Sequence, residues 1–195
     1  MNIFQLSVMA IAWTIIIYTV NCLIARQIKT IDVSKATYYV SAMSMLGVIG
    51  EILIDSIYRV INGGPIWVYR VMPIHGGYTS FYSIVIWGMV GFQLYLIHDT
   101  LAKKKITDIN RLAIFFAVEA ILLEGLFNFS FLAIYGKFVY YYLPNDIWHI
   151  TSLQAFPLYL IAGYISIYAI KQFSTYKRTS SVAFCVLTVS VVFVR

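Results

Sequence analysis

The chain has 195 residues, of which 61% are hydrophobic and only 11% are charged, and its mean hydropathy is +0.82. These values exclude an ordinary soluble domain, in which about 25% of the residues are charged. The formal net charge of +6 does not indicate a nucleic-acid-binding protein. The basic residues form short clusters between apolar segments, which is the pattern of cytoplasmic loops in membrane proteins.

Apolar runs separated by charged residues predict an all-α, polytopic transmembrane helix bundle of five or six spans in one domain, residues 1–195. The first run is too long for the apolar part of a secretory signal, so we interpret it as a retained span. The last run is about 15 residues long and is compatible with a short span, an interfacial helix or a disordered tail. The predicted spans are about 3–25, 36–58, 77–97, 112–136, 148–170 and 180–194.

The distribution of Lys and Arg predicts the orientation of these spans. Ten of the fourteen cations lie in the loops after spans one, three and five: Arg26, Lys29, Lys35, Lys103, Lys104, Lys105, Arg111, Lys171, Lys177 and Arg178. Because cytoplasmic loops are enriched in Lys and Arg, we expect a multi-pass protein of the cell membrane with its N-terminus outside.

Carboxylates inside predicted spans are the most informative residues, since a charged side chain at a span centre costs about 2.5 to 3.5 kcal/mol. Glu51 and Asp55 are four residues apart on one helical stripe, so one of them should hold a proton or share a cation. Glu124 and Asn128 share a face of the span 112–136. Glu119 lies about 140° from Glu124 around that helix, which indicates another partner.

Further polar residues lie at the predicted outer ends of the spans. His75 precedes the span 77–97, and Asp146, His149 and Gln154 lie at the start of the span 148–170. The topology therefore predicts one polar site that opens to the outer face. We assign catalytic roles to Glu51, Asp55, Glu124 and His149, and substrate-binding roles to His75, Asn128, Asp146 and Gln154.

Structural interpretations compete with this site. Glu51 and Asp55 would equally fix helix packing by pairing with Arg59 or Arg70, and Asp146 is a good helix N-cap. Close helix packing explains Gly47, Gly50, Gly88 and Gly91 better than a role in any site.

No catalytic or cofactor motif indicates a familiar soluble chemistry, and the sequence names no cofactor. A metal site would need His75, His149 and Asp146 together with Asp55 or Glu51. Only the three-residue spacing of Asp146 and His149 supports that set locally.

Three functions fit these residues. The first is a membrane-embedded isomerase, cyclase or hydrolase that acts on a lipid or isoprenoid-like substrate by acid-base chemistry. The second is a transporter or substrate-binding subunit for a small solute, and the third is a non-catalytic assembly subunit of the membrane. The expected partners are the lipid bilayer and a hydrophobic small molecule, and the sequence does not determine the oligomeric state.

Overall fold

The computed structural model describes residues 1–103, 108–173 and 177–193, and it confirms the predicted all-α class. Lys104 and Lys105, which support the predicted orientation, and residue 194 of the last predicted span lie outside the described residues. The helices of the described residues are α1 (Ile3–Ala25), α2 (Val33–Asn62), α3 (Ser83–Lys103), α4 (Ile109–Tyr135), α5 (Phe156–Phe173) and α6 (Lys177–Phe193).

Among the described residues, four helical segments are long and apolar enough to cross a membrane: Ile3–Ala25, Val33–Asn62, Ile109–Tyr135 and Leu153–Phe173. Two shorter apolar helices cover Ser83–His98 and Arg178–Phe193. Large apolar side chains such as Phe4 and Leu23 are exposed on the outside of α1, at 73% and 71%. Lipid, not water, is the solvent that suits such a surface.

The ends of the long helices follow from local sequence. The side chain of Asn2 accepts from the third helical backbone N–H of α1, and Asp32 and Asp108 cap α2 and α4 in the same way. These caps satisfy amide groups that have no partner within the helix. Gly63 and Gly136 end α2 and α4 with φ values of 76° and 64°, a left-handed conformation that glycine adopts without steric cost.

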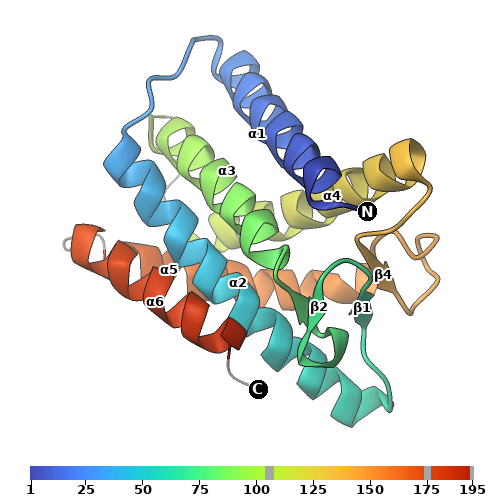
Figure 1. The fold of residues 1–195 in the computed structure, drawn as a ribbon. Coiled ribbons are helices and arrows are strands. Elements are labelled where there is room, and N and C mark those ends of the chain that lie inside the picture. Colours follow the sequence, from blue (N-terminus) through green and yellow to red (C-terminus); the bar gives the residue numbers. More distant parts are fainter. Residues whose placement is uncertain (104–107, 174–176, 194–195) are drawn as a thin grey trace.

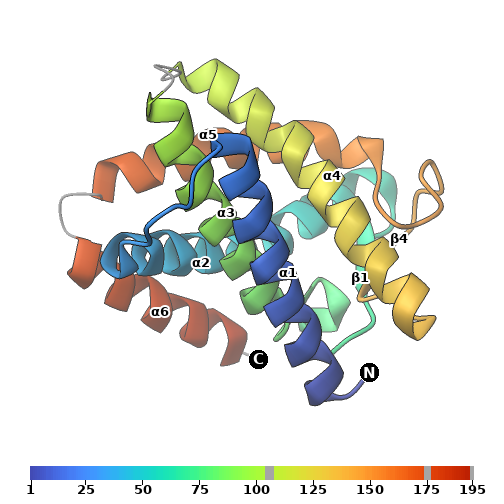
Figure 2. The same cartoon turned by 90° about the horizontal axis from the view of Figure 1, so that it is seen from above.

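The helices form one bundle with short strands at one end. Helix α2 packs against α3 and α6, α4 packs against α5, and α1 packs against α3 (Figure 1). Seen from above, α1 lies over α3 with α4 beside it (Figure 2). A hydrogen bond connects α1 to α4, in which Trp13 Nε1 donates to Ser130 Oγ at 3.1 Å.

Two antiparallel strand pairs lie at the end of the bundle that holds the N-terminus, whereas the α1–α2 connection lies at the opposite end (Figure 1). Strand β1 (Trp67–Tyr69) pairs with β4 (Tyr140–Tyr142), so that Trp67 lies opposite Tyr142 and Tyr69 opposite Tyr140. Strand β2 (Pro73–Ile74) pairs with β3 (Thr79–Ser80) on either side of the turn η1 (His75–Gly77). The β1–β4 pair joins the loop after α2 to the loop after α4.

Glycines allow α2 and α3 to approach closely. A Cβ atom at Gly91 would lie 2.5 Å from the carbonyl oxygen of Tyr39, and one at Gly47 would lie 2.0 Å from Trp87 Cγ. Neither position has room for a side chain, which confirms the packing interpretation there. Gly50 differs, because a Cβ atom at this position would have no heavy atom of another side chain or helix within 4 Å.

Helix α5 begins later than the predicted span 148–170. A 3₁₀ turn, η2 (Leu153–Ala155), precedes it, and Trp148 and His149 have φ values of 46° and 61°, which no right-handed helix accommodates. Asp146 is not the N-cap residue, which is Ser152 for η2, but its Oδ2 accepts from Ser152 Oγ and from the backbone N–H of Leu153, the first residue of η2. Pro157 therefore lies in the first turn of α5, where proline is tolerated, and does not interrupt a span.

The last predicted span is an α-helix along its described length, so the disordered-tail interpretation is wrong. Helix α6 packs on α2 and α5 through Phe184, whose ring centroid lies 6.0 Å from those of Tyr38 and Phe173. His75 Nε2 lies 2.9 Å from the carbonyl oxygen of Val191, which ties the η1 turn to α6.

Candidate functional site

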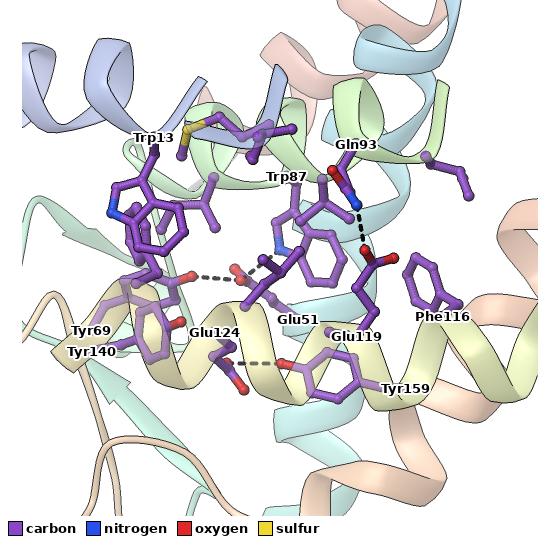
Figure 3. A pocket seen from close by; sticks show the side chains of 18 residues that line it. Trp13, Glu51, Tyr69, Trp87, Gln93, Phe116, Glu119, Glu124, Tyr140 and Tyr159 are labelled. Carbon is purple, nitrogen blue, oxygen red and sulfur yellow. Dashed lines mark hydrogen bonds between the residues drawn. The ribbon is translucent and has the colours of Figure 1, made fainter. Parts of the chain in front are cut away.

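A cavity lies inside the bundle between α1, α3 and α4, and side chains from α2, α5, β1 and β4 close it. Its volume is about 80 Å³, which is enough for a few water molecules or part of a ligand. None of the described residues that line it is Lys, Arg or His. The lining residues (Figure 3) are Trp13, Ile17, Glu51, Tyr69, Ile86, Trp87, Met89, Val90, Gln93, Leu94, Phe116, Glu119, Ala120, Leu123, Glu124, Phe127, Tyr140 and Tyr159.

Glu51 is buried on α2 and accepts four hydrogen bonds from neutral donors. Its Oε1 accepts from Tyr69 Oη at 2.5 Å and Trp87 Nε1 at 2.7 Å, and its Oε2 accepts from Thr79 Oγ1 at 2.5 Å and Ser83 Oγ at 2.7 Å. Two carboxylate oxygens offer about four lone-pair positions, so these four donors fill the acceptor capacity of the group.

The space at Gly47 explains how Trp87 reaches Glu51. Gly47 lies one helical turn before Glu51 on α2, and the indole ring occupies the place of its missing side chain. The indole N–H can only donate, so Trp87 fixes Glu51 as an acceptor (Figure 3).

Glu124 of α4 has a different set of donors. Its Oε1 accepts from Tyr142 Oη at 2.7 Å and Tyr159 Oη at 2.8 Å, and its Oε2 accepts from Thr151 Oγ1 at 2.9 Å. All three donors are hydroxyl groups, which can also accept, and they leave one of the four lone-pair positions open. The two phenol oxygens lie 3.3 Å apart, close enough to exchange a hydrogen bond. Glu124 can therefore hold a proton with little rearrangement.

Tyrosines of the strand pair join the two carboxyl groups. Tyr69, Tyr140 and Tyr142 line a smaller space together with Glu51 and Glu124. Burial raises the pKa of each of these three phenols well above its ordinary value, and the neighbouring carboxyl groups raise it further. The phenols are therefore neutral donors at physiological pH.

A second polar group lies elsewhere along the same cavity. Asn21 Nδ2 donates to Gln93 Oε1 at 2.6 Å, and Gln93 Nε2 donates to Glu119 Oε1 (Figure 3). The sequence predicted that Glu119 has a partner other than those of Glu124, and Gln93 is that partner. The same carboxyl group also lines a neighbouring apolar cavity, beside Tyr39 and His98.

Only two of the eight predicted site residues, Glu51 and Glu124, lie at the cavity. Asp55 is fully buried, and its Oδ1 accepts from Ile66 N at 2.6 Å, which fastens the loop after α2. Its Oδ2 has no hydrogen-bond partner among the described residues. Asn128 is also fully buried, and it binds the backbone of the loop after α4.

The remaining predicted residues belong to the loop end of the bundle. His149 Nδ1 lies 2.6 Å from the carbonyl oxygen of Tyr142, and its ring stacks on Tyr141 at 4.2 Å. Gln154 Oε1 accepts from Tyr58 Oη at 2.6 Å. Asp146 accepts from Ser152 Oγ, and His75 Nε2 lies against the carbonyl oxygen of Val191 in α6. Contrary to the prediction, the eight residues therefore do not converge on one cavity.

The candidate metal ligands are dispersed as well. Over the described ranges of the chain, no three His, Cys, Asp or Glu side chains are grouped as metal ligands. His75 contacts α6, whereas His149 stacks on Tyr141 and Glu51 faces four neutral donors.

Sequence reasoning missed most of the cavity wall, although two signals were present. Gln93 is a polar residue in the middle of an apolar run, and Tyr140 and Tyr142 belong to a run of three tyrosines. Residues with hydrogen-bonding ends inside apolar segments are candidates for buried polar networks. Trp87 and Tyr159 gave no comparable signal.

Comparisons of this chain with known protein families, curated proteins and solved structures gave no significant match. The fold and the cavity therefore carry the functional argument: an all-α protein with several helices able to cross a membrane, and a carboxyl-bearing aromatic cavity among them.

Proposed function

We propose that this chain is a membrane-embedded enzyme that acts on a lipid or isoprenoid-like substrate by acid-base chemistry. One observation carries the proposal: Glu51 and Glu124 line a single aromatic cavity and have different hydrogen-bond environments. Paired carboxyl groups whose surroundings favour different protonation states are the usual arrangement of an acid and a base.

Glu124 is the proposed acid. Its three hydroxyl donors leave room for a proton, and each hydroxyl can turn to accept from the protonated carboxyl group. Glu51 is the proposed carboxylate, because four donors fill its lone-pair positions. It becomes available as a base when the hydroxyl of Thr79 or Ser83 turns away.

The cavity wall suits a positive charge in the substrate. Trp87, Tyr69, Tyr140 and Tyr159 present aromatic rings beside Glu51 and Glu124. Ring faces attract cations, and the attraction grows when water is excluded. A carbocation formed from an alkene would meet these rings and the Glu51 carboxylate.

The simplest reaction is a redox-neutral isomerisation or cyclisation. Glu124 transfers its proton to one carbon of a double bond, and the adjacent carbon becomes a cation. Glu51 then removes a proton from a neighbouring carbon, the new double bond forms, and the product is an isomer of the substrate. The phenols of the smaller space return the proton from Glu51 to Glu124.

The chain's orientation belongs to the same proposal. We place the N-terminus outside the cell membrane and the site toward the outer face. The Lys and Arg distribution supports this topology, and the strand pairs lie at the same end of the bundle as the N-terminus.

Continuous helices favour the enzyme over a transporter. Transporter sites are typically formed by helices that are broken near the membrane centre. Helices α1, α2 and α4 run without interruption, and Pro157 lies in the first turn of α5.

Deuterium exchange tests the proposal without a known substrate. Purified protein in mild detergent is incubated in D₂O with a total isoprenoid lipid extract, and the lipids are analysed by mass spectrometry. We expect one species to gain deuterium with the wild type and not with Glu124→Gln or Glu51→Gln. Asp108→Asn is the control, because Asn replaces Asp well at the N-cap of α4. No deuterium gain with folded wild type, while a lipid still co-purifies, would favour binding or transport over catalysis.

A further inference from the structure

The hydrogen bonds at Asn21 have a fixed direction. Asn21 Nδ2 donates to the carbonyl oxygen of Ile17 at 2.9 Å and to Gln93 Oε1 at 2.6 Å. A carbonyl oxygen only accepts, so the amide nitrogen of Asn21 must face Ile17, and this sets the orientation of the amide group. Asn21 and Gln93 are both buried.

The orientation of Asn21 also fixes which end of Gln93 faces Glu119. Because Gln93 Oε1 accepts from Asn21, Gln93 Nε2 faces Glu119 and donates to its Oε1. The second oxygen of Glu119 has no hydrogen-bond partner among the described residues, and Glu119 lines the cavity. The chain of amides therefore ends on an acceptor that is available to a ligand.

The available acceptor, Glu119, lies on the same helix as the proposed acid, Glu124. Glu119 and Glu124 are five residues apart on α4, which corresponds to about 7.5 Å along the helix axis. Apolar side chains, among them Phe116, Ala120 and Leu123, form the wall near these two residues. A ligand that spans this wall has a donor group at one end and an apolar, reactive part near Glu124.

We infer that Gln93 and Glu119 form a head-group subsite for a hydroxyl or ammonium group of the substrate, which is then an isoprenoid alcohol or amine. The inference rests on the proposed function and specifies its substrate class. The subsite holds the head group while the double bond lies between Glu124 and Glu51. A hydrocarbon without a donor group would leave the second oxygen of Glu119 without a hydrogen-bond partner in an apolar cavity, which is unfavourable.

Three matched ligands test the subsite: farnesol, farnesylamine and farnesyl methyl ether. The purified protein is titrated with each, and binding is followed by tryptophan fluorescence, because Trp13 and Trp87 line the cavity. We expect farnesol or farnesylamine to bind at least about tenfold more tightly than the ether, as a hydrogen bond to a charged group predicts. Equal binding of all three ligands would overturn the subsite.

Variants distinguish the two head groups. If the natural head group is an ammonium, Glu119→Gln lowers farnesylamine affinity by about tenfold or more and Glu119→Leu lowers it at least as much. If it is a hydroxyl, Glu119→Gln keeps farnesol binding and Glu119→Leu loses it. Unchanged affinities in Glu119→Leu would overturn the subsite, and Asp108→Asn is the control for folding.

The outcomes separate the two proposals. Equal binding of the ether together with deuterium exchange that depends on Glu124 would overturn only the subsite. Failure of every ligand to bind, with no deuterium exchange, would overturn both the subsite and the enzyme. Selective binding of the alcohol or amine without deuterium exchange would keep the subsite and favour a transporter or binding protein.

Discussion

The loop end of the bundle and its central cavity use the same kinds of polar residue in different ways. At the loop end, Asn128 and Asp146 bind backbone groups of nearby loops. In the cavity, Glu51 and Glu124 bind side chains from distant parts of the chain and face open space. A polar residue in an apolar helix needs a partner, and the nature of that partner separates a structural role from a chemical one.

Replacing one carboxyl group in each region by its amide should give the largest difference in deuterium incorporation. Glu124→Gln removes the proposed proton donor, and we expect deuterium incorporation to fall by about a hundredfold or more. Asp146→Asn weakens loop bonds only, so incorporation should persist. Mass spectrometry of the lipids measures both, and equal losses in the two variants would remove the distinction between the regions.

Asn128→Leu should have the largest effect on stability. It removes the partners of the carbonyl oxygens of Tyr140 and Ile150 and of the amide of Val139. Each buried unsatisfied group costs about 1–3 kcal/mol, so we expect a loss of about 3 kcal/mol or more. Thermal unfolding in one detergent measures it. Asn145→Ala, at an exposed position in the neighbouring loop, should change stability by less than about 0.5 kcal/mol.

Two glycines on α2 test whether the cavity depends on packing. Gly47→Ala places a Cβ atom 2.0 Å from Trp87 Cγ and should move the indole away from Glu51. We expect a stability loss of about 1–3 kcal/mol and reduced deuterium incorporation. Gly50→Ala is the matched control, because no atom lies within 4 Å and alanine favours the helix by up to about 1 kcal/mol. Similar results for both variants would contradict the proposed role of Gly47.

High pH should expose the buried phenols of the strand pair, with no effect near neutrality. The pKa values of Tyr69, Tyr140 and Tyr142 are raised by burial, so the folded state keeps these protons while the unfolded state loses them above about pH 10. Their contribution to stability is present below pH 10 and declines as the pH rises further. Tyrosinate absorbance and thermal unfolding should change together, and ionisation of all tyrosines before unfolding would contradict this.

The sequence alone could predict that Glu51 and Glu124 matter, because ionisable residues inside apolar helices are rare and costly. It also predicted catalytic roles for Asp55 and His149 and a substrate-binding role for Asn128, but their contacts in the structure are to loop backbone or to a neighbouring ring. Spacing along a helix shows which residues share a face, but it does not show whether a loop folds back to meet them.

Hydropathy and charge determined the all-α class and the approximate positions of the helices, since burial in lipid requires long apolar segments with internally satisfied backbones. Local caps such as Asp32 and Gly63 determined where helices begin and end. Only the tertiary structure brought Tyr69 and Tyr140 together in the β1–β4 pair and placed Trp87 against Gly47. These contacts join residues far apart in the chain, and their energy depends on packing in three dimensions, which no local pattern of residues encodes.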